Sequence, residues 1–218
     1  MTDGVLFICH ANVCRSRLME HEFRTAERAS GAERWRASSA GVAAVAGHPV
    51  CDEVQGLVTA TGEDELVSLS DHGAVLLDRD LLQDAGLVLT ATRAERADVA
   101  LLIPAMRSRT FTLREAVTLA QIEPATAAGR SEDASGLLAA FAGFLDQHRG
   151  SVRADNRTRS GWLRPRDRSH DVDIPDAHHR RLKDHHRVLQ TVQEQTIALH
   201  TLLRAFADRS GRRAARGL

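Results

Sequence analysis

The residues best suited to chemistry lie between Cys9 and Ser16, in the stretch CHANVCRS. A cysteine thiolate is a strong nucleophile, and the planar fork of Arg15, six positions later, matches two oxygens of a phosphate group. The spacing is weak evidence by itself, because all of the 29 basic residues except Lys183 are arginines and chance pairings are therefore common. The pair indicates phosphoryl chemistry only if the local structure brings the two side chains together.

The residues on either side of this stretch predict a strand, a short loop and a helix. Gly4–His10 is an apolar run typical of a buried parallel strand, and Arg15–Arg28 carries apolar residues at helical spacing. A loop that ends at a helix N-terminus turns backbone N–H groups inward and adds the positive end of the helix dipole, which makes an anion site. That field favours the thiolate form of Cys9, and the Ser16 hydroxyl could donate a hydrogen bond to the sulfur. We therefore predict a phosphate-binding loop made of His10, Ala11, Asn12, Val13, Cys14, Arg15 and Ser16.

Further strands and helices alternate along the chain and predict parallel β-α-β units. Strands are expected at Trp35–Ser39, Gly86–Ala91 and Arg109–Thr112. Helices are expected at Val50–Thr61, near Leu81, and at Arg93–Leu102, Leu113–Leu119, Ala134–His148 and His178–Ala207. The segments 123–133 and 151–176 have no regular period. We predict one domain over residues 1–208, with an irregular insertion at about 120–170 and a flexible tail at 209–218.

The composition is that of a globular domain in a reducing compartment. The 218 residues are 43% hydrophobic, which supplies a core, and no apolar run is long enough for a membrane span. The net charge is zero and aromatic residues make up 4%, which argues against general binding to nucleic acid. Three cysteines do not make a disulfide scaffold, and the first residues have no signal-peptide pattern. We expect a cytoplasmic protein that binds neither membranes nor nucleic acid and is a monomer or a weak dimer.

The motif and its neighbours resemble the low-molecular-weight protein tyrosine phosphatase family, whose loop reads C-x-G-N-x-C-R-S. The likeness covers about residues 4–119 and 171–206 and includes the segments SAG at 39–41, GHP at 47–49 and DIPD at 173–176. It implies a flavodoxin-like open parallel sheet of about four strands with helices on both faces. It also implies hydrolysis of phosphomonoesters, above all protein phosphotyrosine, through a phosphocysteine and without a cofactor. The partner would be a phosphorylated protein or a small phosphomonoester.

The resemblance implies a role for each matching residue. Cys9 would be the nucleophile, Arg15 would hold the phosphate, and Asp176 would protonate the leaving oxygen and then activate water. The loop would be held in shape by Asn12, Ser16, Ser39 and His72. Two alternatives stay open for the acid: Asp176 could merely cap the following helix, and Asp171 or Asp173 could take its place.

Several positions depart from the family pattern. The loop glycine is Ala11, which would be strained if a positive φ is required there. Ala177 replaces the proline after the acid, and His178 and His179 stand where aromatic residues are frequent. Few aromatic side chains remain to sandwich a phosphotyrosine ring, so His178 or Trp162 would have to serve. The alternatives are a phosphate-binding module without turnover, an arsenate reductase-like enzyme and an arginine phosphatase-like enzyme.

Two further features of the sequence have more than one interpretation. Cys14 could protect Cys9 by forming a reversible disulfide, or it could simply fill space inside the loop. Among the histidines of the predicted last helix, a spacing of seven could place His178 beside His185 in a zinc or nickel site, with His179 and His186 next to them. Because the pattern supplies no thiolate beside these histidines, we predict no metal.

Overall fold

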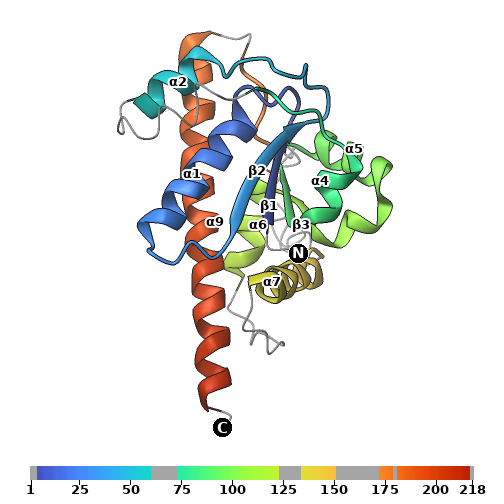
Figure 1. The fold of residues 1–218 in the computed structure, drawn as a ribbon, viewed down its shortest axis with the longest axis vertical. Helices are drawn as coiled ribbons and strands as arrows, with labels where there is room; N and C mark the ends of the chain where they lie inside the picture. The colour runs from blue at the N-terminus through green and yellow to red at the C-terminus, as the bar shows by residue number, and fades with distance from the viewer. Residues whose placement is uncertain (1–3, 60–72, 123–133, 151–171, 179–180, 217–218) are drawn as a thin grey trace, which may run out of the picture.

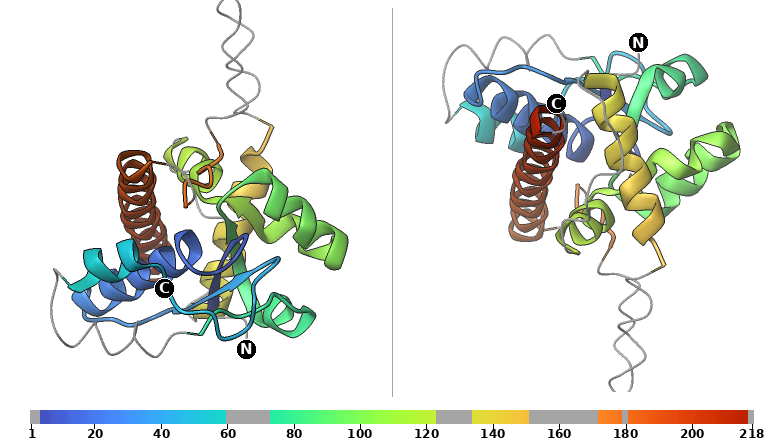
Figure 2. Two further views of the ribbon diagram at one scale, coloured as in Figure 1. Left: turned by 90° about the horizontal axis from the view of Figure 1, so that it is seen from above. Right: turned by 90° about the horizontal axis from the view of Figure 1, so that it is seen from below.

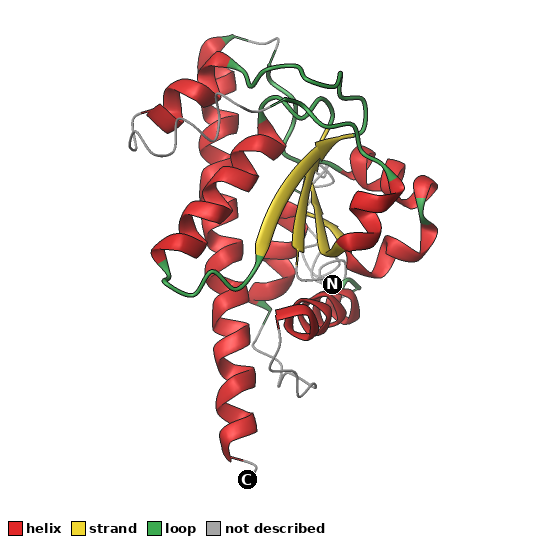
Figure 3. Ribbon diagram, viewed as in Figure 1, coloured by secondary structure: helices red, strands yellow, loops and turns green. Residues whose placement is uncertain are grey.

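The computed structural model describes residues 4–59, 73–122, 134–150, 172–178 and 181–216. The centre of this part of the chain is a sheet of four parallel strands, β1 (Gly4–Cys9), β2 (Arg36–Gly41), β3 (Ala85–Thr90) and β4 (Thr110–Thr112). The strands lie in the order β2-β1-β3-β4, with each neighbouring pair parallel, as the yellow arrows in Figure 3 show. This order confirms the predicted flavodoxin-like α/β fold.

Helices cover both faces of the sheet (Figures 1 and 2) because the buried side chains of each strand alternate between the faces. Val5 and Phe7 of β1 belong to a core shared with α1 (Arg15–Ala29), α6 (Leu113–Gln121), α7 (Ala134–His148) and α9 (Leu182–Arg216). Leu6 and Ile8 face the opposite core, which includes residues of α4 (Arg79–Asp84), α5 (Arg93–Leu102) and the 3-10 helix η1 (Pro104–Arg109). The remaining helix, α2 (Asp52–Thr59), lies near the start of α9 in Figure 1.

Most elements begin and end within a few residues of their predicted bounds, and α5 and α7 match them. The last helix differs at both ends. It begins at Leu182, so His178 lies in a turn before the helix and not on it. It also continues past Ala207 to Arg216, into the segment expected to be a tail. Within the described residues, no helix is both long enough and apolar enough to span a membrane.

α9 lies along α1 and contacts it over several turns (Figure 1). His200 Nε2 of α9 lies 2.8 Å from Oε1 of Glu27, and the Glu27 side chain also accepts hydrogen bonds from the amides of Arg34 and Trp35. Burial raises the pKa of Glu27, but His200 and the two amides outweigh it, so the pKa is lowered. The contact therefore favours the ionised carboxylate of Glu27, which links α9 to α1. The first turn of α9 lies beside the loop between β1 and α1, where His185 contacts Cys14.

Several predictions lie outside the described residues. They concern His72, Asp171, Trp162 and His179, and the irregular segments at 123–133 and 151–171. The division into a domain at 1–208, an insertion and a tail stays a prediction.

Candidate active site

Cys9 lies where the first strand meets the first helix. It ends β1, Arg15 begins α1, and Cys9 Sγ lies 3.0 Å from the hydroxyl oxygen of Ser16. The carbonyl oxygens of Cys9, His10 and Val13 accept hydrogen bonds from amides outside the loop. Because a trans peptide places its N–H opposite its carbonyl, the amides that follow these carbonyls turn toward the inside of the loop. The phosphate loop, residues 10–15, can therefore present N–H donors to an anion bound at Cys9.

Asn12 is the central contact of the phosphate loop. It is fully buried, and its amide nitrogen donates hydrogen bonds to the hydroxyls of Ser16 and Ser39, both at 2.9 Å. Its amide oxygen accepts a hydrogen bond of 2.9 Å from the backbone N–H of Val75. Ser39 in turn donates to a carboxylate oxygen of Glu20 at 2.6 Å. The structure thus brings together three of the four residues expected to hold the loop in shape, and Glu20 joins them.

The backbone of the phosphate loop explains how it accommodates Ala11 in place of glycine. Within the described residues, only Asn12, with a φ of 57°, and Glu33 have positive φ among residues other than glycine. Asparagine tolerates this conformation, and Ala11 does not adopt it, so the strain considered from the sequence is absent. The glycine that the loop requires is Gly41 of β2. The loop backbone passes so close to it that a Cβ atom there would lie 2.7 to 2.8 Å from backbone atoms of residues 10–12.

Arg15 connects the phosphate loop to a distant part of the chain. Its side chain is 4% exposed, and its Nη1 donates a hydrogen bond of 3.0 Å to the carbonyl of Ile174. Its Nη2 lies 2.7 Å from a carboxylate oxygen of Asp176, and Glu95 lies 3.6 Å from Nη1. The guanidinium is therefore oriented by two carboxylates and a carbonyl, next to the loop that holds Cys9.

The acid segment, residues 172–178, is held across the ends of β3 and β4. The hydroxyl of Thr112 donates to the carbonyl of Val172 at 2.7 Å, and the N–H of Ile174 donates at 2.8 Å to a carbonyl just past β3. Asp173 accepts the backbone N–H of Arg93 at 2.8 Å and pairs with its guanidinium. Asp173 is thus held at the start of α5, whereas Asp176 contacts Arg15.

Asp176 is half exposed and faces the phosphate loop through Arg15. Its other carboxylate oxygen accepts the backbone N–H of His178 at 2.9 Å. Burial raises the pKa of Asp176, but the His178 amide and the Arg15 guanidinium outweigh it, so the pKa is lowered. α9 begins only at Leu182, so Asp176 is not the residue directly before that helix.

The part of the chain that carries Cys9 and Arg15 is matched by a family of known proteins. The family model described as low molecular weight phosphotyrosine protein phosphatase matches residues 4–125, more than half of the chain. The chain belongs to this family. It is therefore a cysteine-dependent phosphatase, as its sequence predicted.

Three solved structures illustrate the relationship. A low molecular weight protein tyrosine phosphatase from T. tengcongensis is 26% identical over 70% of this chain and 98% of its own, with a TM-score of 0.47. A protein tyrosine phosphatase from Entamoeba histolytica is 12% identical over 90% of this chain and 93% of its own, with a TM-score of 0.57. YfkJ from Bacillus subtilis is 16% identical over 89% of this chain and 92% of its own, with a TM-score of 0.55. The latter two share the fold, and no curated protein matches the sequence.

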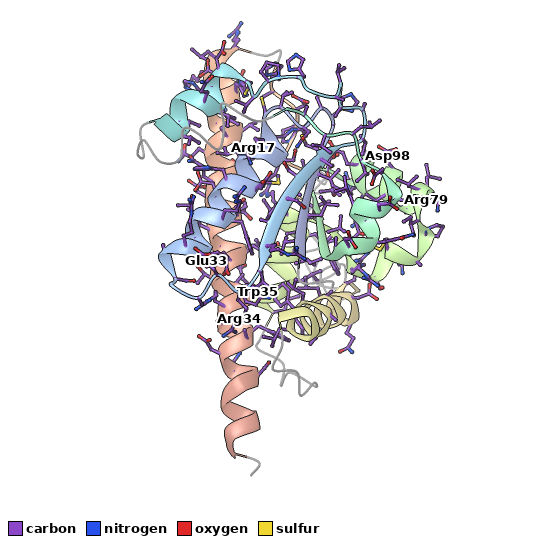
Figure 4. All side chains as sticks on the ribbon, in the orientation of Figure 1. Arg17, Glu33, Arg34, Trp35, Arg79 and Asp98 are labelled. Atoms are coloured by element: carbon purple, nitrogen blue, oxygen red, sulfur yellow. The ribbon has the colours of Figure 1, made fainter. Side chains whose placement is uncertain are left out.

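In this phosphatase, the sequence did not indicate two buried carboxylates at the site. Glu20 is 8% exposed and pairs with Arg17 at 2.9 Å, near the start of α1 in Figure 4, while Glu95 is 5% exposed beside Arg15. Each lies on a predicted amphipathic helix, where an acidic residue normally faces solvent. A buried carboxylate must be paired. Glu20 has arginine partners on its own helix, Arg17 and Arg24, but only the packing of α1 in the fold buries this side of the helix.

An apolar cavity of about 640 Å³ opens beside the phosphate loop. His10 of the loop lines it together with apolar side chains from the segment after β2, from residues 76–77 and from α5: Val42, Ala43, Leu76, Leu77, Leu101 and Leu102. Asp98 of α5, labelled in Figure 4, is the charged residue of the lining.

Cys14 contacts His178 and His185, the two histidines for which the sequence indicated no neighbouring thiolate. Its Sγ lies 3.2 Å from Nδ1 of His178 and 3.6 Å from Nε2 of His185, and Cys51 lies in the same group. The sequence argument placed His178 on the last helix, which was wrong, yet the two imidazoles meet with their centroids 5.5 Å apart.

Proposed function

We propose that the protein hydrolyses phosphomonoesters, with protein phosphotyrosine as the preferred class, through a phosphocysteine at Cys9. The observation that carries the proposal is the buried Arg15 guanidinium, which joins the loop around Cys9 to the carboxylate of Asp176. Nucleophile, anion holder and acid are the three groups that this reaction requires. Cys9 and Arg15 lie at the two ends of one loop, and Asp176 comes from a distant part of the chain. The free thiols of Cys9, Cys14 and Cys51 fit a cytoplasmic protein.

The first half of the reaction would form one bond and break another at phosphorus. The Cys9 thiolate attacks the phosphorus atom, an S–P bond forms, and the bond from phosphorus to the leaving oxygen breaks as that oxygen takes the Asp176 proton. The loop amides and the Arg15 fork hold the three equatorial oxygens, whose charge they stabilise. The Ser16 hydroxyl, 3.0 Å from the sulfur, would stabilise the thiolate that later leaves.

The second half would return the enzyme to its starting state. The Asp176 carboxylate takes a proton from a water molecule, the water oxygen bonds to phosphorus, and the S–P bond breaks to release phosphate and the Cys9 thiolate. Asp176 therefore acts as acid and then as base, which balances its proton over the cycle.

The lowered pKa of Asp176 describes the enzyme before substrate binds. A phosphate dianion in the loop would compete for the Arg15 donors and place negative charge beside Asp176. Both changes favour the protonated carboxyl, the form required for the first half of the reaction. Substrate binding would thus convert Asp176 from a partner of Arg15 into an acid.

The cavity beside His10 supports an aromatic phosphomonoester as substrate. Its walls are mainly leucine and valine side chains, so a phenyl ring would bury apolar surface there without the aromatic sandwich expected from the family. A phosphorylated guanidinium would instead place charge against these walls, where Asp98 is the one carboxylate among the described residues of the lining. The cavity therefore favours phosphotyrosine over phosphoarginine.

The test is the pH dependence of p-nitrophenyl phosphate hydrolysis for wild type, Cys9→Ser and Asp176→Asn. We expect an acidic optimum, no turnover in Cys9→Ser and slow turnover in Asp176→Asn. Peptides carrying phosphotyrosine, phosphoserine or phosphoarginine then compare substrate classes, and the phosphotyrosine peptide should have the highest kcat/KM. Turnover that survives Cys9→Ser, in protein with an unchanged circular dichroism spectrum, would exclude the mechanism.

A further inference from the structure

Four side chains that could hold a metal ion converge beside the phosphate loop. We propose that Cys14, Cys51, His178 and His185 bind one Zn²⁺ ion, at a site separate from the position of the phosphate. One possible ligand atom from each residue lies within 4.8 Å of all the others. This inference replaces the expectation of no metal, which rested on the lack of a thiolate beside the histidines.

The distances between the ligand atoms agree with a tetrahedral ion. Zinc bonds of about 2.3 Å to sulfur and about 2.0 to 2.1 Å to nitrogen place neighbouring ligands about 3.3 to 3.8 Å apart in a tetrahedron. Cys14 Sγ lies 3.2 Å from His178 Nδ1 and 3.6 Å from His185 Nε2. The remaining separations stay within 4.8 Å, so small side-chain movements complete the coordination shell.

The set of donors selects the kind of metal. Two thiolates and two imidazoles form a closed shell typical of structural zinc, whereas magnesium and calcium require oxygen ligands. The two thiolates balance the charge of the ion, so the occupied site adds no net charge beside the phosphate loop. With four protein ligands, the ion has no open position for substrate, and it takes no part in the chemical steps.

Four segments that are distant in the sequence supply the ligands. Cys14 comes from the phosphate loop, Cys51 from the residue before α2, His178 from the acid segment and His185 from the first turn of α9. The N–H of Cys51 also donates to a carbonyl of the phosphate loop at 2.9 Å. In Figure 1 the start of α9, α2 and the loop after β1 lie at the same end of the molecule.

Three of the four side chains are buried and one is exposed, which suits a metal site that is shielded from water but accessible to an ion from one side. Cys14 is 6% exposed, Cys51 9% and His185 6%, whereas His178 is exposed. The ion would therefore enter from the side of His178, and the buried ligands would then exclude water from it. A disulfide between Cys14 and Cys51 is the alternative explanation for two neighbouring cysteines. It would not account for the two imidazoles that contact Cys14, whereas a metal ion uses all four side chains.

An ion at this position would act on the acid segment. His178 follows Asp176 by two residues, and its backbone N–H already donates to the Asp176 carboxylate. Coordination of His178 would tie the end of the acid segment to Cys14, the residue before Arg15. The metal would thereby hold the acid near the phosphate loop as a positioning device.

The experiment measures metal binding by the full chain under reducing conditions. Protein stripped with a chelator is titrated with Zn²⁺ in competition with a chromogenic chelator, and with Co²⁺, whose absorption reports tetrahedral thiolate coordination. The variants are Cys51→Ser and His185→Gln, with His186→Gln as the matched control. His186 is the exposed neighbour of His185 on α9, pairs with Glu53, and does not belong to the group.

We expect wild type to bind one Zn²⁺ per chain and to give thiolate absorption with Co²⁺. Loss of a side chain that only hydrogen-bonds to a metal ligand typically lowers metal affinity by roughly 10- to 100-fold. Because Cys51→Ser and His185→Gln each remove a ligand itself, each should lower the affinity for Zn²⁺ by more than that. His186→Gln and Cys9→Ser should bind as wild type does, which separates this site from the phosphatase reaction. Three outcomes would overturn the proposal: no thiolate absorption in reduced wild type, unchanged affinity in folded Cys51→Ser, or a Cys14–Cys51 disulfide in protein purified with reductant.

Discussion

The phosphate loop and the acid segment are held in place in different ways. The loop follows its strand directly, and Asn12 and its partners form hydrogen bonds that are shielded from water. The acid segment is attached at its beginning to Thr112 and Arg93, while its Asp176 is half exposed. The loop thus keeps one geometry. The carboxylate of Asp176, by contrast, can give up its contact with Arg15 when it becomes protonated. The difference suits an anion site that must be ready before binding and an acid that responds to binding.

The largest effect is expected where the two regions meet, at Arg15. Arg15→Lys keeps the charge but loses the fork that contacts Asp176 and the Ile174 carbonyl. We expect kcat for p-nitrophenyl phosphate to fall by about 10²- to 10³-fold, the cost of removing a donor that stabilises the transition state. Steady-state kinetics of Arg28→Lys, in the last turn of α1, should match wild type. Near-normal kcat in Arg15→Lys would contradict the role of the fork.

Gly41→Ala changes the loop without touching the acid segment. The new Cβ atom would lie 2.7 to 2.8 Å from loop backbone, which cannot move away without distorting the anion site. We expect the free energy of unfolding in urea to fall by about 1 to 3 kcal/mol, together with weaker inhibition by phosphate. Gly56→Ala in α2 is the control, because nothing lies within 4 Å of its Cβ position. Equal stability of the two variants would show that the close approach is relaxed in solution.

Asp173→Asn changes the acid segment without touching the loop. It weakens the contact with Arg93 that holds the segment at the start of α5. We expect kcat to fall by about 10-fold for phenyl phosphate and less for p-nitrophenyl phosphate, because a poor leaving group depends more on a positioned acid. Inhibition by phosphate should not change. An equal loss with both substrates would mean that Asp173 acts on the loop as well.

The smallest effect is expected in stability as a function of pH. The pKa of Asp176 is lowered below its ordinary value of 3.8, so its contacts stabilise the folded protein above that pH. This contribution is lost as the pH falls through the lowered pKa. Because the side chain is half exposed, we expect only about 0.5 kcal/mol or less. Urea unfolding of wild type and Asp176→Asn should differ at pH 7, and the difference should shrink as the pH falls below 3.8; a difference that grows toward acidic pH would reverse the sign.

The fold could be predicted closely from the sequence because its signals are local. β1, α5 and α7 each carry a hydrophobic pattern or an end signal within the element itself. The last helix was placed less well. Its start follows the acid segment, whose contacts with β3 and β4 leave no periodic pattern in the sequence. Its last turns extend beyond the end of α1 in Figure 1.

The sequence by itself determined the phosphate loop, because a strand, a five-residue turn and a helix start are consecutive, and the helix start turns backbone N–H groups toward a bound anion. Only the tertiary structure decided what surrounds that loop. It set Asp176 against Arg15, it buried Glu20 and Glu95, and it gathered two cysteines and two histidines from four segments. These contacts join residues far apart in the chain, and their geometry follows from how the helices pack on the sheet.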